Sequence, residues 1–226
     1  MEQESKVRGG IAGIIRNDAL LFEGDLRPYF RAIFYDARNL LNPYHNGRHM
    51  LHVLWLCYQA CIFYGTLSKR EVRNIFIAAM FHDFNHTGKS GPDSVNIERA
   101  IVALKEHIMD EDIEELPKII EIIMATEFPY QTPSDQLGLT LKIIRDADLS
   151  QVLDPVWLQQ VVLGLAAEWG KTPCEILKMQ DLFLGNLKFA TEWAREKFPE
   201  IDIKSKIAEA KDLLALLEEE PVSQAV

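Results

Sequence analysis

Histidine is concentrated in two short segments of the sequence. The stretch NPYHNGRHMLH contains His45, His49 and His52, which are half of the six histidines in the chain. On a helix, residues at positions i, i+4 and i+7 share one face, so the three rings would point to the same side. Imidazoles at this density suggest either a metal site or a helix face lined with histidine.

A second segment, FHDFNHTG, places His82 and His86 four residues apart with Asp83 between them. The two histidines continue the apolar stripe that contains Ile75 and Ala79, so we expect them to point into the protein, with Gly88 ending the helix. A buried histidine must be neutral, hydrogen-bonded or bound to a metal, because burying an unpaired charge is costly.

A third segment, IIRDADLSQ, carries Asp146 and Asp148 directly after an apolar run. A single inward histidine is usually structural, but two pairs at i, i+4 spacing beside carboxylates are poorly explained as independent core residues. Imidazole and carboxylate ligands together suit zinc, iron, manganese or nickel, and magnesium prefers the carboxylates. The residues that could hold one ion are His49, His82, Asp83 and Asp148.

The same ligands suggest hydrolysis of a phosphate ester. Asp83 has two oxygens and could bridge to a second ion, and two ions about 3.5–4 Å apart lower the pKa of a shared water and stabilise an in-line phosphoryl displacement. His45 and His86 would remain beside the metals, and one of them could protonate a leaving oxygen.

Composition limits the class of protein and its partners. At 226 residues, 48% of them hydrophobic, the chain can bury one sizeable core. A formal net charge of −10 argues against a nucleic-acid duplex as partner, and bound metal would attract a small anionic substrate. We expect no membrane association, because no apolar run approaches the ~18 residues that span a bilayer. Three cysteines and a polar start, MEQESKVRGG, favour a reduced cytoplasmic protein.

The elements that must position these residues are helices. Apolar residues recur with helical spacing, and no strong alternating strand pattern or long linker interrupts them. We therefore predict a single all-α domain over 1–226, with a core at about 17–217 and a frayed tail at 218–226. Ser68 with Glu71 forms a capping box that opens one of the helices. Apolar helical runs are predicted at 53–65, 68–84, 110–127, 154–169, 173–198 and 202–219.

The motifs and their order resemble a known family. A histidine, a His-Asp pair and a later aspartate are similar to the HD superfamily of metal-dependent phosphohydrolases. A closer resemblance is to the class I cyclic-nucleotide phosphodiesterases, whose first two signatures are similar to NPYHNGRH and HDFNHTG. Their last metal-binding segment resembles ADLS, and their purine-recognition segment resembles MQDLFLGNLKFATEW. The likeness runs from about Asn42 to Trp193 and implies a compact multi-helix phosphodiesterase-like domain.

The resemblance assigns a role to each matching residue. It implies a tight metal site, for zinc, iron, manganese or nickel, formed by the four ligands above, and a second site for magnesium or manganese. His45 would be the general acid for the departing 3′-oxygen. His86 would orient water or ligands near the metals. The remaining matched residues are Tyr44, Gln151, Gln180 and Phe183 for substrate binding, and Asn46 and Glu127 as candidates for contacts behind the metal ligands.

The base-recognition pair consists of an amide and a ring. Gln180 would hydrogen-bond the base edge while Phe183 stacks on the base, and a glutamine amide can rotate to suit either purine. Several positions depart from the family pattern: Asn85 and Thr87 replace an aspartate and a proline, and His52 replaces an aspartate. Gln151 stands where an asparagine that contacts nucleotides is usual.

Three functions are compatible with this pattern. The first is a phosphodiesterase that hydrolyses 3′,5′-cyclic nucleotides to 5′-monophosphates through a metal-bridged hydroxide. The second is another HD phosphohydrolase acting on a nucleoside monophosphate, a dNTP or a hyperphosphorylated nucleotide, which would need the metals but neither His45 nor the Gln180–Phe183 pair. The third is a non-catalytic nucleotide-binding module, which the complete ligand set disfavours. The first is our prediction.

Overall fold

The structure is a computed structural model that describes residues 10–218. No strand occurs in that range, which confirms the all-α prediction, and the predicted tail lies outside it apart from Glu218. The helices are α1 (Ile11–Ile15), α2 (Arg27–Tyr35), α3 (Gly47–Tyr64), α4 (Lys69–Phe81), α5 (Ser94–His107), α6 (Leu116–Met124), α7 (Leu139–Leu149), α8 (Leu163–Trp169), α9 (Pro173–Asn186), α10 (Glu192–Lys197) and α11 (Glu200–Glu218). Shorter segments are η1 (Asp110–Glu115), η2 (Ser134–Gln136), η3 (Ser150–Leu153) and a π-helical segment, η4 (Leu158–Val162).

Helices α3 and α4 form the centre of the molecule and pack against each other. Every residue of α4 from Val72 to Phe81 is buried, as expected for a helix enclosed on all sides. The predicted capping box is present: the Ser68 hydroxyl accepts from the Glu71 amide, and the Glu71 carboxylate accepts from the Ser68 amide. This cap fixes where α4 begins, and α4 in turn delivers the His-Asp segment at its other end.

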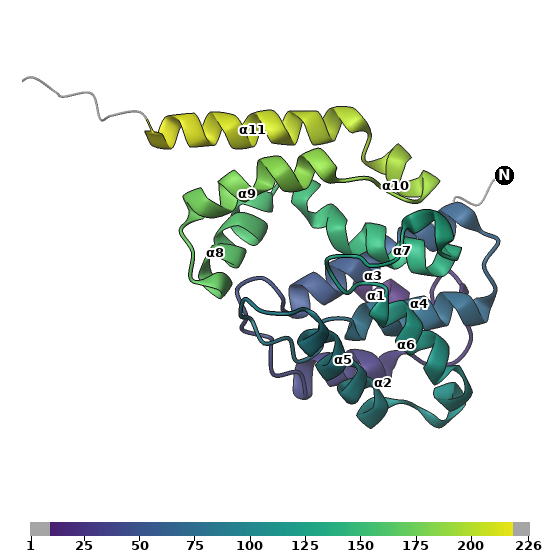
Figure 1. The fold of residues 1–226 in the computed structure, drawn as a ribbon. Helices are drawn as coiled ribbons and strands as arrows, with labels where there is room; N and C mark the ends of the chain where they lie inside the picture. The colour runs from purple at the N-terminus through teal and green to yellow at the C-terminus, as the bar shows by residue number, and fades with distance from the viewer. Residues whose placement is uncertain (1–9, 219–226) are drawn as a thin grey trace, which may run out of the picture.

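The remaining helices form two groups around this centre. Helices α2, α5, α6 and α7 lie with α3 and α4 in the larger body of the molecule, while α8, α9 and α11 form a layer along one side (Figure 1). Within that layer α9 and α11 lie side by side along most of their length. Ile14 and Ile15 of α1 are buried in the core, so the described core begins at this first helix.

Three predicted helical runs are divided in the structure, and one of them, 154–169, is the π-helical segment η4 followed directly by α8. The predicted run 173–198 forms two helices, because Asp146 of α7 binds the backbone between α9 and α10. The carboxylate of Asp146 accepts from the amides of Ala190 and Thr191 and from the Thr191 hydroxyl, and Thr191 then caps α10. The run 110–127 begins as the 3-10 segment η1, because Pro117 in the first turn of α6 has no amide hydrogen to extend the helix backwards.

A buried charged network holds η1 against α4. Asp112 is fully buried and accepts hydrogen bonds from the Arg73 guanidinium at 2.8 and 2.7 Å, from the Tyr29 hydroxyl at 2.7 Å and from Arg70 at 2.8 Å. Burial alone would raise the pKa of Asp112, but the hydrogen bonds from Arg73 and Tyr29 outweigh it and lower the pKa. The network thus joins α2 and η1 to the first half of α4, whereas His82 follows the other end of that helix.

Cys57 and Cys61 are buried in α3, Cys174 is partly buried, and all three are free thiols. Among the described residues, no helix has the length and apolar character needed to cross a bilayer. The cytoplasmic location stays a prediction.

Candidate metal and catalytic site

Four side chains from three parts of the chain bring their ligand atoms together. His49 lies in the first turn of α3, His82 and Asp83 follow the end of α4, and Asp148 lies near the end of α7. His49 Nε2 is 3.3 Å from Asp83 Oδ2 and 3.0 Å from Asp148 Oδ1, and His82 Nε2 is 3.4 and 3.5 Å from the same two oxygens. These four residues are the predicted tight-site ligands.

This cluster has the properties of a metal site. Ligand atoms about 2.0–2.1 Å from a tetrahedral zinc are themselves about 3.3 Å apart, which is close to the observed separations. His82 Nε2 and Asp83 Oδ2 are buried and have no hydrogen-bond partner among the described residues. Unpaired buried polar atoms are costly, and a cation between them would satisfy both. The residues present therefore fit a divalent metal.

The other nitrogen of each histidine ring is already engaged. His82 Nδ1 is 2.9 Å from the carbonyl oxygen of Ala79, and His49 Nδ1 is 2.7 Å from Oε1 of Gln151. If each Nδ1 carries the proton, both Nε2 lone pairs face the cluster, which is the usual arrangement for a metal-binding histidine. Gln151 also donates to Gln160, so both ends of its amide are engaged behind His49.

The cluster favours positive charge. Burial opposes protonation of His82, but the nearby carboxylates of Asp83 and Asp148 outweigh it and raise the pKa of His82 to about 9. The same pairing lowers the pKa of Asp83 and of Asp148 against the effect of their burial, so both carboxylates are ionised at neutral pH. A bound metal ion would take the place of the proton on His82, because a histidine must lose that proton to coordinate a metal.

His45 lies beside the cluster and is bonded to a glutamate distant in sequence. Its Nδ1 is 2.6 Å from Glu168 Oε2, and Glu168 Oε1 accepts from the amides of Tyr44 and His45 at 2.9 and 2.8 Å. The Glu168 side chain is completely buried on α8. Burial would lower the pKa of His45, but Asp83 and Glu168 outweigh it and raise the pKa. His45 therefore has a bonded Nδ1 and an Nε2 that can carry a proton.

His86 stacks on His45 and stays neutral. The ring centroids are 3.8 Å apart with an interplanar angle of 21°. Burial and the neighbouring His45 lower the pKa of His86 to about 4, and its Nδ1 accepts from the amide of Gly88 at 3.0 Å. The nitrogens of His45 and His86 and an oxygen of Glu168 lie close together, but nearly parallel rings cannot aim their in-plane lone pairs at one ion. We therefore interpret this second cluster as a proton-donor site.

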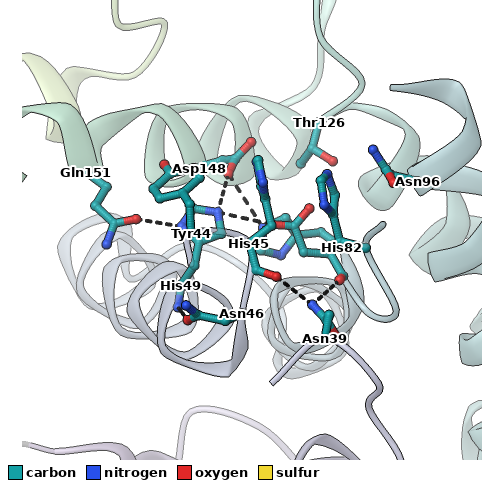
Figure 2. Close-up of polar contacts among 12 residues, drawn as sticks. Asn39, Tyr44, His45, Asn46, His49, His82, Asn96, Thr126, Asp148 and Gln151 are labelled. Atoms are coloured by element: carbon teal, nitrogen blue, oxygen red, sulfur yellow. Dashed lines mark hydrogen bonds and ion pairs between the residues drawn. The ribbon is translucent and has the colours of Figure 1, made fainter. Parts of the chain in front are cut away.

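Two asparagines fix the backbone of the site. Asn39 is buried and its Nδ2 donates at 2.8 Å both to the carbonyl oxygen of His45 and to that of Asp83 (Figure 2). Asn46 is the N-cap of α3 and accepts from the amide of His49 at 3.2 Å. Asn46 thus contacts the predicted metal ligand His49 through the backbone amide, and its role behind the metal ligands stays a prediction.

Local backbone structure at the histidines differs from the helical expectation. His45 precedes α3, so the three histidines of the first segment do not share one helical face, and His52 turns toward Asp154, 3.8 Å away. Helix α4 ends at Phe81, well before Gly88, and the positive φ of Asn85 turns the chain between His82 and His86. Asparagine tolerates this conformation better than most residues.

The predicted substrate residues lie in two places. The Tyr44 ring contacts the rings of His45 and His49, with centroids 4.6 and 5.0 Å apart. Gln180 is buried on α9 with its Oε1 unpaired among the described residues, and Phe183 is half-buried one turn later. Glu127 is partly exposed after the end of α6.

Sequence reasoning missed Glu168 and Asn39. Glu168 is the only charged residue between positions 155 and 170, and a lone acid in an apolar helix is a signal for a buried, paired carboxylate. Asn39 carries no comparable signal, because its role is to bond two carbonyl groups that meet only in the folded chain.

The fold is shared with phosphodiesterase domains of known structure. The phosphodiesterase domain of the RhoPDE fusion protein from the choanoflagellate Salpingoeca rosetta is 16% identical, with a TM-score of 0.68 over 97% of this chain and 94% of that chain. A second structure, of the phosphodiesterase domain of Salpingoeca rosetta rhodopsin phosphodiesterase, has the same identity and TM-score over 96% and 90%. The structure of LmjPDEB1 in complex with IBMX is 16% identical, with a TM-score of 0.60 over 91% and 85%.

No protein-family model matches the sequence, and no curated protein matches it either. The likeness in three dimensions shows the fold, and it confirms the compact phosphodiesterase-like helical fold that the motifs implied.

Proposed function

We propose that this protein is a metal-dependent phosphodiesterase that hydrolyses 3′,5′-cyclic nucleotides to 5′-monophosphates. The observation that carries the proposal is the position of His45, which is held by a buried glutamate beside four convergent metal ligands. A hydrolase for phosphoanhydrides has less need of a proton donor, because phosphate leaves as a stable anion, whereas the alkoxide that leaves an alkyl phosphate ester needs a proton. The neighbouring structures, which are of phosphodiesterase domains, favour a diester over a monoester.

The metal-binding residues would be His49, His82, Asp83 and Asp148 for a tightly held zinc, iron, manganese or nickel ion. Asp83 would also contact a second ion, magnesium or manganese. When bound, such ions activate water as a nucleophile and offset the negative charge of the phosphate. The donor distances and the two unpaired buried atoms support this assignment.

His45 would donate the proton that the departing 3′-oxygen needs. Its Nδ1 faces Glu168, which holds the ring in one orientation and stabilises its protonated form, so the Nε2 proton is available to the substrate. His86 is neutral with its Nδ1 accepting a backbone amide, so its Nε2–H can donate to water or phosphate oxygen beside His45.

Gln180 and Phe183 would recognise the base. The unpaired Oε1 of Gln180 offers a hydrogen bond to the base edge, and the half-exposed ring of Phe183 offers a stacking face. Tyr44 would contact the substrate next to His45, and Gln151 would act mainly by orienting His49. The neighbouring structures are of phosphodiesterase domains, which supports the same reaction class.

A hydrolysis panel tests the proposal. Purified protein with Mg²⁺ or Mn²⁺ is assayed on cAMP, cGMP, nucleoside monophosphates and dNTPs. We expect conversion of a cyclic nucleotide to its 5′-monophosphate. Activity confined to monophosphates or dNTPs would instead identify another HD phosphohydrolase, and metal-replete protein inactive on every substrate would point to a binding module.

A further inference from the structure

The segment at positions 125–132, between α6 and η2, is fastened to the helix that carries Asp148. Arg145 of α7 is buried, and its guanidinium donates to the carbonyl oxygens of Ala125 and Thr132, the latter at 2.7 Å. The same guanidinium lies 4.1 Å from the centroid of the Tyr130 ring. Arg145 thus holds both ends and the middle of this segment, three residues before a metal ligand.

A second set of bonds fastens the segment to the other half of the site. The amide of Phe128 donates to Asp93 at 2.8 Å, and Asp93 also accepts from Asn96 at 3.4 Å. Asn96 accepts in turn from the amide and the hydroxyl of Thr87, both at 3.0 Å, and Thr87 follows His86. Phe128 is therefore positioned relative to His86 as well as to Asp148.

The segment places an aromatic ring against the predicted base-stacking residue. The centroids of Phe128 and Phe183 are 6.2 Å apart with an interplanar angle of 59°, and those of Phe128 and Tyr130 are 5.5 Å apart. Phe128 is 50% exposed despite these contacts. The Tyr130 hydroxyl in this segment and Gln180 Oε1, three residues before Phe183 on α9, are buried without a hydrogen-bond partner among the described residues.

Aromatic rings in contact, with unpaired buried polar atoms on the same elements, are the features of a site for a flat, polar ring. We propose that Phe128 is a second specificity residue, which forms with Phe183 an aromatic corner that receives the base of the nucleotide. The rings are too close to admit a base between them, but a base can stack on one ring and meet the other edge-to-face. The inference rests on the proposed function, since it takes a nucleotide to be the substrate.

The corner can be tested by comparing ligands with and without a base. Binding of AMP and of ribose 5-phosphate is measured by calorimetry in the presence of Mn²⁺ for the wild type, Phe128→Ala, Phe128→Leu and Phe34→Ala. Phe34 is 51% exposed on α2 and is the matched control. We expect Phe128→Ala to weaken AMP about tenfold, as stacking contacts of this kind do, and to leave ribose 5-phosphate unchanged. Phe128→Leu should lie in between, and Phe34→Ala should match the wild type.

Other results would overturn the corner. Equal weakening of both ligands would mean that Phe128 acts on the segment as a whole, and unchanged AMP binding would remove it from the site. Wild-type protein that binds both ligands equally would show that no base is recognised. In a Phe183→Ala background, the effect of Phe128→Ala should shrink, because the two rings contact the same base.

The outcome is distinguishable from failure of the proposed function. If no cyclic nucleotide is hydrolysed but Phe128→Ala selectively weakens AMP, the corner stands and the reaction must be reassigned. If cyclic nucleotides are hydrolysed and Phe128→Ala binds AMP like the wild type, the reaction stands and the corner fails.

Discussion

His45 and Glu168 are separated by 123 residues in sequence and joined by a 2.6 Å contact between a ring nitrogen and a carboxylate oxygen. The same carboxylate accepts two backbone amides at the turn that carries His45. One buried side chain of α8 therefore fixes the position and ring orientation of the proposed proton donor and, together with Asp83, favours its protonated form.

Replacing His45 by alanine should separate proton donation from metal binding. We expect a loss of about 10²–10⁴ in kcat for a cyclic nucleotide, because its alkoxide leaving group needs a proton. Hydrolysis of a bis(4-nitrophenyl) ester should fall much less, because its leaving oxygen departs as a stable anion. Metal content, measured on the same preparation, should be unchanged. A similar loss on both esters would contradict the general-acid assignment.

Glu168→Gln should change the pH profile. Glutamine still accepts the two backbone amides but removes the negative charge that helps to raise the pKa of His45. Since a general acid works only when protonated, a lower pKa moves the alkaline limb of the kcat/KM profile to lower pH. Glu106→Gln, an exposed change on α5, is the control and should leave the limb in place. If Glu168→Gln lowers kcat/KM by the same factor at every pH and leaves the alkaline limb in place, Glu168 has a structural role.

Removing a metal ligand should cost both metal and stability. His49→Ala or Asp148→Ala should release the tightly bound ion, measured by elemental analysis, and abolish hydrolysis. Stripping the wild type with a chelator should lower Tm by roughly 5–10 °C relative to protein in metal at about a hundred times its Kd.

His52→Ala is the matched control for the metal ligands, because its ring lies in α3 near His49 but faces Asp154. It should keep the metal and the activity. Loss of metal in this variant would mean that the first histidine segment supplies a different ligand.

Gln180→Ala should affect base recognition alone. Removing the amide takes away the hydrogen bond to the base edge, so we expect KM for purine cyclic nucleotides to rise about tenfold. Esters without a base should be hydrolysed as before. If both classes of substrate lose activity together, Gln180 supports the packing of α9 instead.

Asp112→Asn should destabilise the fold without involving the site. Its amide cannot replace the carboxylate for Arg73 and Arg70, and although Arg73 keeps its ion pair with Glu111, breaking a buried ion pair costs about 3–5 kcal/mol in the free energy of unfolding. The pKa of Asp112 is lowered in the folded state, so its contribution is complete above the unfolded value of about 3.9 and is lost as pH falls through the folded value. Urea unfolding should therefore show a large difference from the wild type at pH 7 that narrows in strong acid.

The matched control for Asp112 is Asp18→Asn. Asp18 forms an exposed pair with Arg16, and such pairs contribute little to stability. An equal effect of the two substitutions would show that the buried network is not what stabilises η1.

The sequence-based predictions are most accurate for features that depend on residues close together in the sequence. The capping box of Ser68 and the apolar periodicity of α3 and α4 are local, and both are confirmed. The four metal ligands are predicted from their residue types and spacing and again from the resemblance to a family, and the structure brings them together, but whether they bind metal stays a prediction.

Contacts between distant segments could not be read from the sequence. The division between α9 and α10 depends on Asp146, which caps a backbone segment more than forty positions away. The partner of His45 depends in the same way on how α8 packs against the turn before α3. In the first case a carboxylate binds backbone amides and interrupts what would otherwise be one helix. In the second, the partner of a histidine is determined only once the chain has folded.

The two carbonyl bonds of Asn39 have a consequence for how the site works. Side chains can rotate, but the main-chain points from which His45 and Asp83 project are tied to a single amide nitrogen. The distance between the proposed proton donor His45 and the proposed metal ligand Asp83 is therefore set by the backbone before any substrate binds. The longer amide of an Asn39→Gln variant would change that distance while keeping every reactive group in the chain.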